Sequence, residues 1–237
     1  MRKDTDNLRL ATMDDIPALQ GLIALSATTL SVNDYIPEEI TSLNSFVFGV
    51  DKTLIEDQTY FVIERNNLII ACGGWSQRAK LFGGDQFEGA KEILLDPATD
   101  AAKLRAFFIH PVCARQGLAT KLLKHCEAEA LKHGFTKIEL MSTLPGISFY
   151  KSQGFVGKQE AVHELQNGVK VKFLEMVKDP IMQPELKVNV KPIFNSWLGF
   201  NRNTAILASL AVVTIGLGLG VGVACVRGRT MSNKPSP

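Results

Sequence analysis

Apolar and polar positions change their spacing repeatedly along this chain of 237 residues, and the changes predict where strands and helices lie. Short apolar or alternating runs predict strands at 7–11, 59–64, 68–73, 104–109 and 136–141, and a final hairpin over 155–177 that turns at Asn167-Gly168. Helical spacing, with acidic or proline starts, predicts helices at 12–28, 37–48 and 145–153, and one that ends near His133 before Gly134. The stretch 76–99 shows neither period, so we expect an irregular loop there.

The order of these elements predicts an α/β fold. A strand, a helix and a strand follow one another over 104–141, and two strands joined by a helix are expected to pair in parallel. The hairpins on either side make the other pairs antiparallel. We therefore expect a mixed, mostly antiparallel sheet flanked by helices.

The last 33 residues have a different composition. From Ala205 to Val226 no residue is charged, and a helix of that length would span about 33 Å, enough for a bilayer core of about 30 Å. The alternative is a buried core helix. We expect a catalytic domain at 1–178, a linker with an interfacial aromatic end at 179–203, a transmembrane helix at 204–226 and a short basic tail at 227–237.

Four glycines within this predicted span (Gly216, Gly218, Gly220 and Gly222) give small-x-x-x-small spacings. Such spacings let two membrane helices approach closely, so a homodimer is one hypothesis and plain lipid packing is the other. The polar N-terminal residues 1–7 show no apolar leader. We expect a single-pass C-terminal anchor with the catalytic domain in the cytosol, and the identity of the membrane stays open.

Charge and cysteine usage exclude several classes of function. The formal net charge is +2, with 26 Lys and Arg against 24 Asp and Glu, so the chain offers no broad basic field for nucleic acid. The four cysteines (Cys72, Cys113, Cys126 and Cys225) are far apart and form no C-x-x-C pair. Neither disulfides nor a metal site is expected.

The segment 107–120 carries the candidate chemistry, because a buried strand is followed there by a loop of small residues that opens a helix. Amides at a helix N-terminus are unpaired and lie at the positive end of the helix dipole, so they can hold a pyrophosphate. Gly117 and Ala119 leave room for phosphate oxygens, and Arg115 adds a cation. Small residues can also begin a helix merely to pack.

Two motifs in this order resemble those of the GNAT superfamily of N-acetyltransferases. Gly117-x-Ala119 fits the second half of its coenzyme A loop, [Gln/Arg]-x-x-Gly-x-[Gly/Ala], although Ala114 replaces the first residue. Phe149-Tyr150 with Gly154-Phe155 fits its Phe-Tyr-x-x-x-Gly-Phe signature, although Thr143 stands where the family often has Asn. The resemblance covers about residues 7–178 and implies a GNAT fold with acetyl-CoA as co-substrate.

This resemblance implies direct transfer of an acetyl group to a primary amine, either of a small molecule or of a protein. Tyr150 would protonate the departing CoA thiolate, and a phenol of pKa about 10 suits a thiol leaving group. A strand-end amide near Phe108 or Ile109 would stabilise the oxyanion. The expected cofactor-binding residues are Phe108, Ile109, Arg115, Gln116, Gly117, Leu118, Ala119 and Thr120.

No general base is evident. Glu139 could face the cleft or lie on the outer face, and His110 could act as a base or be a hydrogen-bonding turn residue. His125 and His133 are expected at the surface, and no pattern around His163 indicates a function. Cys113 is expected to pack rather than react.

The loop 76–99 and its border supply candidates for acceptor recognition, namely Trp75, Arg78, Asp85 and Phe87. The other interpretation is a surface loop with Trp75 packed beneath it. A different class of function is a CoA-binding, membrane-tethered scaffold without turnover, which Ala114 and Thr143 favour and Tyr150 opposes.

Overall fold

The computed structural model describes residues 6–81, 83–85 and 93–181. Its strands are β1 (Asn7–Leu10), β2 (Tyr60–Arg65), β3 (Leu68–Ser76), β4 (Ala102–Ile109), β5 (Ile138–Thr143), β6 (Val156–Glu164) and β7 (Lys170–Lys178). Its α-helices are α1 (Ile16–Leu30), α2 (Pro37–Phe46), α3 (Lys52–Glu56), α4 (Leu118–Lys132) and α5 (Ile147–Ser152). Short 3-10 turns lie at η1 (Met13–Asp15), η2 (Pro111–Cys113) and η3 (Leu144–Gly146).

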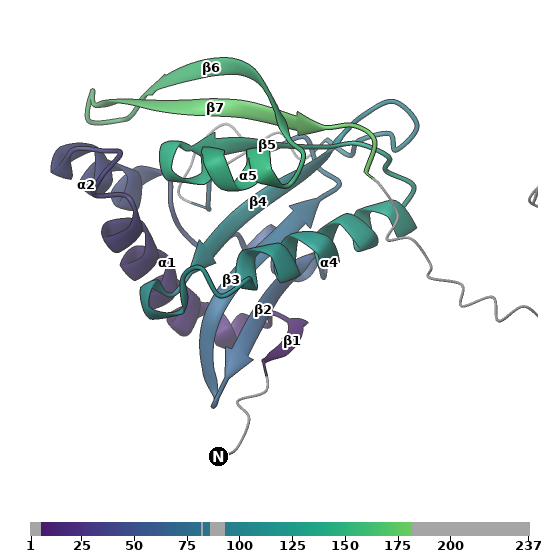
Figure 1. Cartoon of the computed structure of the whole chain (residues 1–237), viewed down its shortest axis with the longest axis horizontal. Coiled ribbons are helices and arrows are strands. Elements are labelled where there is room, and N and C mark those ends of the chain that lie inside the picture. The colour runs from purple at the N-terminus through teal and green to yellow at the C-terminus, as the bar shows by residue number, and fades with distance from the viewer. Residues whose placement is uncertain (1–5, 82, 86–92, 182–237) are drawn as a thin grey trace, which may run out of the picture. The chain divides into compact units, whose positions relative to one another are not determined.

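The strands form one sheet in the order β1-β2-β3-β4-β5-β7-β6, with helices on both faces (Figure 1). Among the described strands, every neighbouring pair is antiparallel except β4 and β5, which are parallel. This confirms the mixed sheet and the crossover through α4. The β2–β3 turn uses Asn66 and Asn67, both with positive φ, and the β6–β7 turn uses Gly168 at φ 82°.

Strand β2 shows how the sheet separates two cores. Phe61 and Ile63 face α4 and join its Leu122 in one cluster, whereas alternate residues of the same strand face α1 and α3 in another. A strand that is buried on both faces has a nearly continuous apolar sequence, and β2 has one. A third cluster joins α2 to β7.

Strand β4 carries a bulge opposite Gly73. Cys72 pairs with Phe108 and Gly74 with Arg105, so Ala106 and Phe107 together face one residue of β3. Ala106 adopts φ 57°, a left-handed conformation that is uncommon outside glycine. The Phe107 ring lies where a Gly73 side chain would be, because a Cβ there would come within 2.6 Å of it.

The parallel pairing of β4 with β5 is short. Only Ala102 with Ile138 and Lys103 with Glu139 are in register, and beyond them the two strands separate (Figure 1). The crossover unit predicts parallel strands but gives no sign of this separation. It creates the space in which the candidate site lies.

Some boundaries differ from the sequence prediction. Strand β3 continues to Ser76, past the predicted end at residue 73, because Gly73 and Gly74 fit under Phe107 and Tyr60 instead of ending the strand. The five-residue helix α3 was not predicted. Ile181, placed in the predicted linker, is buried in the main core.

The predicted span 204–226, the tail 227–237 and most of the predicted linker lie outside the described residues. Within the part of the chain that the structure does describe, no helix is long and apolar enough to cross a membrane.

A first prediction concerns the bulge. Gly73→Ala should lower the free energy of unfolding by about 1–3 kcal/mol, because its methyl group must displace the Phe107 ring that packs on Gly73. The measurement is denaturant unfolding of the full chain. Gly21→Ala is the matched control, since its Cβ meets nothing within 4 Å and should be neutral or stabilising. Equal stability of the two variants would contradict the close packing of Phe107 on Gly73.

Candidate active site

A cavity of about 840 Å³ opens where β4 and β5 separate. One side is lined by the start of α4 and by α5, and the other by the end of α1, the loop at 47–49, and Leu81, Gly83 and Gly84. The facing ends of β4 and β5 form its floor. Because the two strands separate, the backbone of β4 borders both the part of the cavity beside α4 and the part beside α1.

The start of α4 is shaped to hold an anion. Gly117, at the N-cap, has φ 82°, Arg115 has φ 62°, and no side chain caps the helix. The amide of Lys121 is bonded to the Gly117 carbonyl at 3.0 Å, which leaves the amides of residues 118–120 at the positive end of the helix dipole. The cavity reaches these residues and Arg115, and a Cβ on Gly117 would meet nothing within 4 Å.

Gln116 differs from the residues around it. Its side-chain oxygen accepts a hydrogen bond from Arg65 Nη1 at 3.0 Å, and its amide nitrogen donates to the Val112 carbonyl at 3.2 Å. Gln116 is not among the residues that line the cavity. Arg65, from the β2–β3 hairpin, therefore holds this side chain outside the cavity lining, and the cofactor contact of Gln116 stays a prediction.

Phe108 and Ile109 both line the cavity, and their cofactor contact stays a prediction. The Ile109 amide already donates a hydrogen bond to Ser26 Oγ at 3.2 Å, and the Phe108 ring packs edge-on against Phe48 with centroids 5.4 Å apart. Ser26 is 4% exposed and comes from α1. No motif indicates this contact, since a serine inside an apolar helix 83 residues away shows nothing of its partner.

Tyr150 lines the cavity from α5. Its ring packs against Phe149 and Phe155, with centroid distances of 5.0 and 5.5 Å, and Gly146 leaves room beside it. Within the described residues, its hydroxyl has no hydrogen-bond partner. Burial, with a smaller effect of the Cys126 thiol, raises the pKa of Tyr150 well above its usual value. The phenol therefore keeps its proton at neutral pH and can donate it.

The candidate bases do not reach the cavity. Glu139 forms ion pairs with Lys103 and, at 3.5 Å, with Lys158, which agrees with the outer-face interpretation. His110 Nδ1 accepts from the Val112 amide at 3.3 Å, as a turn residue does. The described residues that line the cavity include no Asp, Glu or His.

The other histidines lie elsewhere. His133 is exposed and packs against Trp75, whereas His125 is half-buried with its ring edge-on to Phe61, 4.4 Å between centroids. The surface prediction for His125 is therefore wrong, because the helix face that carries it also touches β2. His163, in β6, packs edge-on against Phe173.

The described residues predicted to recognise the acceptor lie outside the cavity lining. Trp75 is 1% exposed in β3, Arg78 pairs with Asp57 at 2.7 Å, and Asp85 accepts from the Lys52 amide at 3.1 Å. None of these predicted residues lines the cavity, and Phe87 lies outside the described residues. Trp75 thus fits the alternative interpretation, a side chain packed in the core.

Cys113, which was expected to pack, is 8% exposed and borders the cavity. Its sulfur lies 3.8 Å from Arg65 Nη1. Across residues 6–81, 83–85 and 93–181, no three His, Cys, Asp or Glu side chains come together as metal ligands.

Comparison with known proteins places this geometry in a family. Residues 29–155, more than half of the chain, match the family model described as the acetyltransferase (GNAT) family. The chain belongs to the GNAT family. As a member of this family it is an acetyl-CoA-dependent acetyltransferase. The coarse expectation of enzyme class and co-substrate is thereby confirmed.

Solved structures share the fold of this GNAT chain at low sequence identity. A GCN5-related N-acetyltransferase from Rhodopseudomonas palustris is 16% identical with a TM-score of 0.55, covering 76% of this chain and 98% of its own. The PaiA N-acetyltransferase of Thermoplasma acidophilum, solved in complex with coenzyme A, is 14% identical with a TM-score of 0.50, covering 74% and 99%. No curated protein matches the sequence. At these identities the structural likeness shows the fold alone.

Proposed function

We propose that this GNAT chain transfers the acetyl group of acetyl-CoA to a primary amine by direct attack, with Tyr150 as the acid that protonates the CoA sulfur. The observation that carries the proposal is that an uncapped helix N-terminus and an unpartnered, protonated phenol line one cavity. The first suits a pyrophosphate and the second suits a thiolate leaving group.

The start of α4 is the proposed pyrophosphate site. Amides at residues 117–120 would donate to the phosphate oxygens, and Arg115 would add a cation beside them. Because Gly117 faces open space, the backbone there is approachable. The solved relative with coenzyme A bound supports the same ligand class for this fold.

Tyr150 is the proposed general acid. The neutral amine attacks the thioester carbonyl, the C–S bond breaks, and the phenol donates its proton to the sulfur before regaining one from solvent. Since no carboxylate or imidazole is among the described lining residues, the amine proton would leave through water. Burial of the phenol keeps the acid in its protonated form until it is needed.

The membrane anchor is part of the proposal. The charge-free run at 204–226 would hold the domain at a membrane surface, with the domain on the cytosolic side. Full-length chain should stay in the membrane fraction after alkaline carbonate washing, and a chain ending before Asn201 should be released. Release of the full-length chain would overturn the anchor and leave the enzyme proposal intact.

The pyrophosphate site can be tested by adding a negative charge. Gly117→Glu should abolish CoA binding in calorimetric titration, because a carboxylate would repel phosphate beside the amides of α4. Gly168→Glu is the matched control, since Gly168 also has φ 82° and open space around it but lies in the β6–β7 turn. It should bind CoA like the unchanged chain. Equal binding by both variants would place the phosphates elsewhere.

The role of Tyr150 predicts both a rate and a pH profile. Tyr150→Phe should lower kcat for CoA release by about 100-fold or more while leaving CoA affinity nearly unchanged, because it removes only the proton donor. Since burial raises the pKa of Tyr150, the acid stays protonated through alkaline pH, so the unchanged enzyme should show no descending limb below about pH 10. CoA binding without thiol release by the unchanged chain would instead favour a scaffold.

A further inference from the structure

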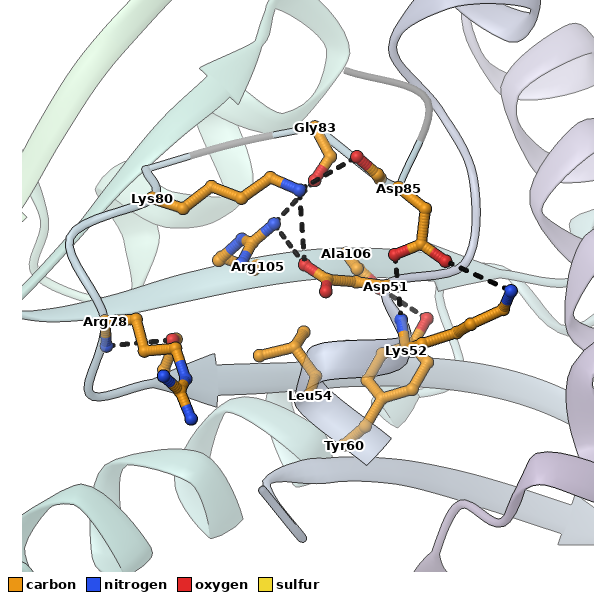
Figure 2. Close-up of polar contacts among 12 residues, drawn as sticks. Asp51, Lys52, Leu54, Tyr60, Arg78, Lys80, Gly83, Asp85, Arg105 and Ala106 are labelled. Atoms are coloured by element: carbon orange, nitrogen blue, oxygen red, sulfur yellow. Dashed lines mark hydrogen bonds and ion pairs between the residues drawn. The ribbon is translucent and has the colours of Figure 1, made fainter. Parts of the chain in front are cut away.

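Three charged side chains from separate parts of the chain meet beside the cavity (Figure 2). Arg105 of β4 forms an ion pair with Asp51, which precedes α3, and Lys80 Nζ lies 4.0 Å from the same carboxylate. Arg105 Nη2 also donates to the Gly83 carbonyl at 2.5 Å, and Lys80 donates to the Gly84 carbonyl at 2.9 Å. We call Asp51, Lys80 and Arg105 the buried charge cluster.

Two cations of the buried charge cluster share the Asp51 carboxylate. The partly exposed Asp85, which pairs with Lys52 at 3.9 Å, also attracts both cations. The side chains of Asp51 and Arg105 are only 1% and 3% exposed. A charge buried away from water is costly unless its partners compensate it fully.

Two observations show that Arg105 is incompletely compensated. Its Nε is buried and has no hydrogen-bond partner. Burial lowers the pKa of Arg105 and also that of Lys80, in each case against the opposing attraction of Asp51. An anion placed beside Arg105 would therefore be stabilised there.

Arg105 belongs to the half of the cavity opposite α4. Gly83, whose carbonyl it touches, lines the cavity with it. The remaining surface of that half is mostly apolar, contributed by Leu30, Val47, Phe48, Leu81 and Phe173. The described lining residues include no carboxylate that could receive a second cation of a polyamine or an aminoglycoside.

We propose that the acceptor is a primary amine that carries a carboxylate and an apolar body, and that Arg105 is the residue that recognises the carboxylate. This inference rests on the proposed acetyl transfer and names its substrate class. The guanidinium is held by Asp51 and Gly83, so it meets the carboxylate in a fixed position. The apolar body fills the surface between α1 and the loop at 47–49.

The test compares amines that differ only in the carboxylate. The full chain is assayed for CoA release with leucine, methionine and phenylalanine, with their decarboxylated amines, and with spermidine. At least one amino acid should exceed its decarboxylated partner in kcat/KM by about tenfold or more, the usual effect of a charge-assisted contact. Arg105→Met should bring that ratio close to one.

Two further variants test whether a lost ratio is due to Arg105 itself. Arg78→Met also removes an arginine from an ion pair, but Arg78 does not line the cavity, so the ratio should persist. Because Arg105→Met alone leaves Asp51 buried without its main partner, Asp51→Asn combined with Arg105→Met keeps the site closer to neutral and should show the same lost ratio.

The outcomes separate this inference from the proposed function. Acetylation of spermidine or of decarboxylated amines in preference to amino acids would overturn the carboxylate inference and leave acetyl transfer standing. CoA binding with no acetylation of any amino acid in the panel would also overturn the carboxylate inference, and CoA release with another amine of the panel would then show whether acetyl transfer stands. Absence of CoA binding by the unchanged chain, titrated in parallel, would overturn the proposed function itself.

Discussion

The separation of β4 from β5 is the constraint on which the rest of this structure depends. A continuous parallel pair would close its own hydrogen bonds and leave no cavity, but here the register ends after Lys103 and Glu139. The bulge at Ala106 and Phe107 accompanies this change, since it bends β4 and increases its twist. It is tolerated because Gly73 gives the Phe107 ring room and because Ala106 adopts a left-handed conformation.

The bulge also determines which side chains face which partner. In a regular strand Arg105 and Ala106 would point to opposite faces. Here Leu104 and Phe107 both join the α4 cluster, whereas Ala106 joins the α1 cluster. Ordinary alternation from Leu104 already places Arg105 on the side where Asp51 lies, between α2 and α3. The bulge adds Ala106 to that same side, so the cation and the bulged backbone are neighbours there.

Local patterns in the sequence were sufficient for much of this fold. The apolar runs flanking Asn66-Asn67 predicted the β2–β3 hairpin, and Gly117 and Gly134 marked both ends of α4. The prediction was wrong at one pair of glycines, because Gly73 and Gly74 suggested the end of β3 although the strand continues to Ser76. Helix α3 was missed because five residues are too few to show a helical period.

Contacts between distant residues could not be predicted in the same way. Arg65 holds Gln116 away from the cavity across 51 positions, and Ser26 bonds the Ile109 amide across 83. The pairing of Arg105 with Asp51 is of this kind. None of these side chains stands in a motif, so only the folded chain shows which of them is free to meet a ligand.

The two halves of the cavity are linked through one strand, and this constrains the acceptor. Arg105 and Ile109 are four residues apart on β4, which at about 3.3 Å per residue is about 13 Å and is shorter where the strand bulges. The acceptor amine must reach the thioester beside α4 while its carboxylate meets Arg105. In an α-amino acid one carbon separates the amine from the carboxylate, so the side chain of Arg105, which lines the cavity, would have to cover most of that distance. A long cation would extend past Arg105 without a described carboxylate to receive its second charge, so charge selects against that class of acceptor.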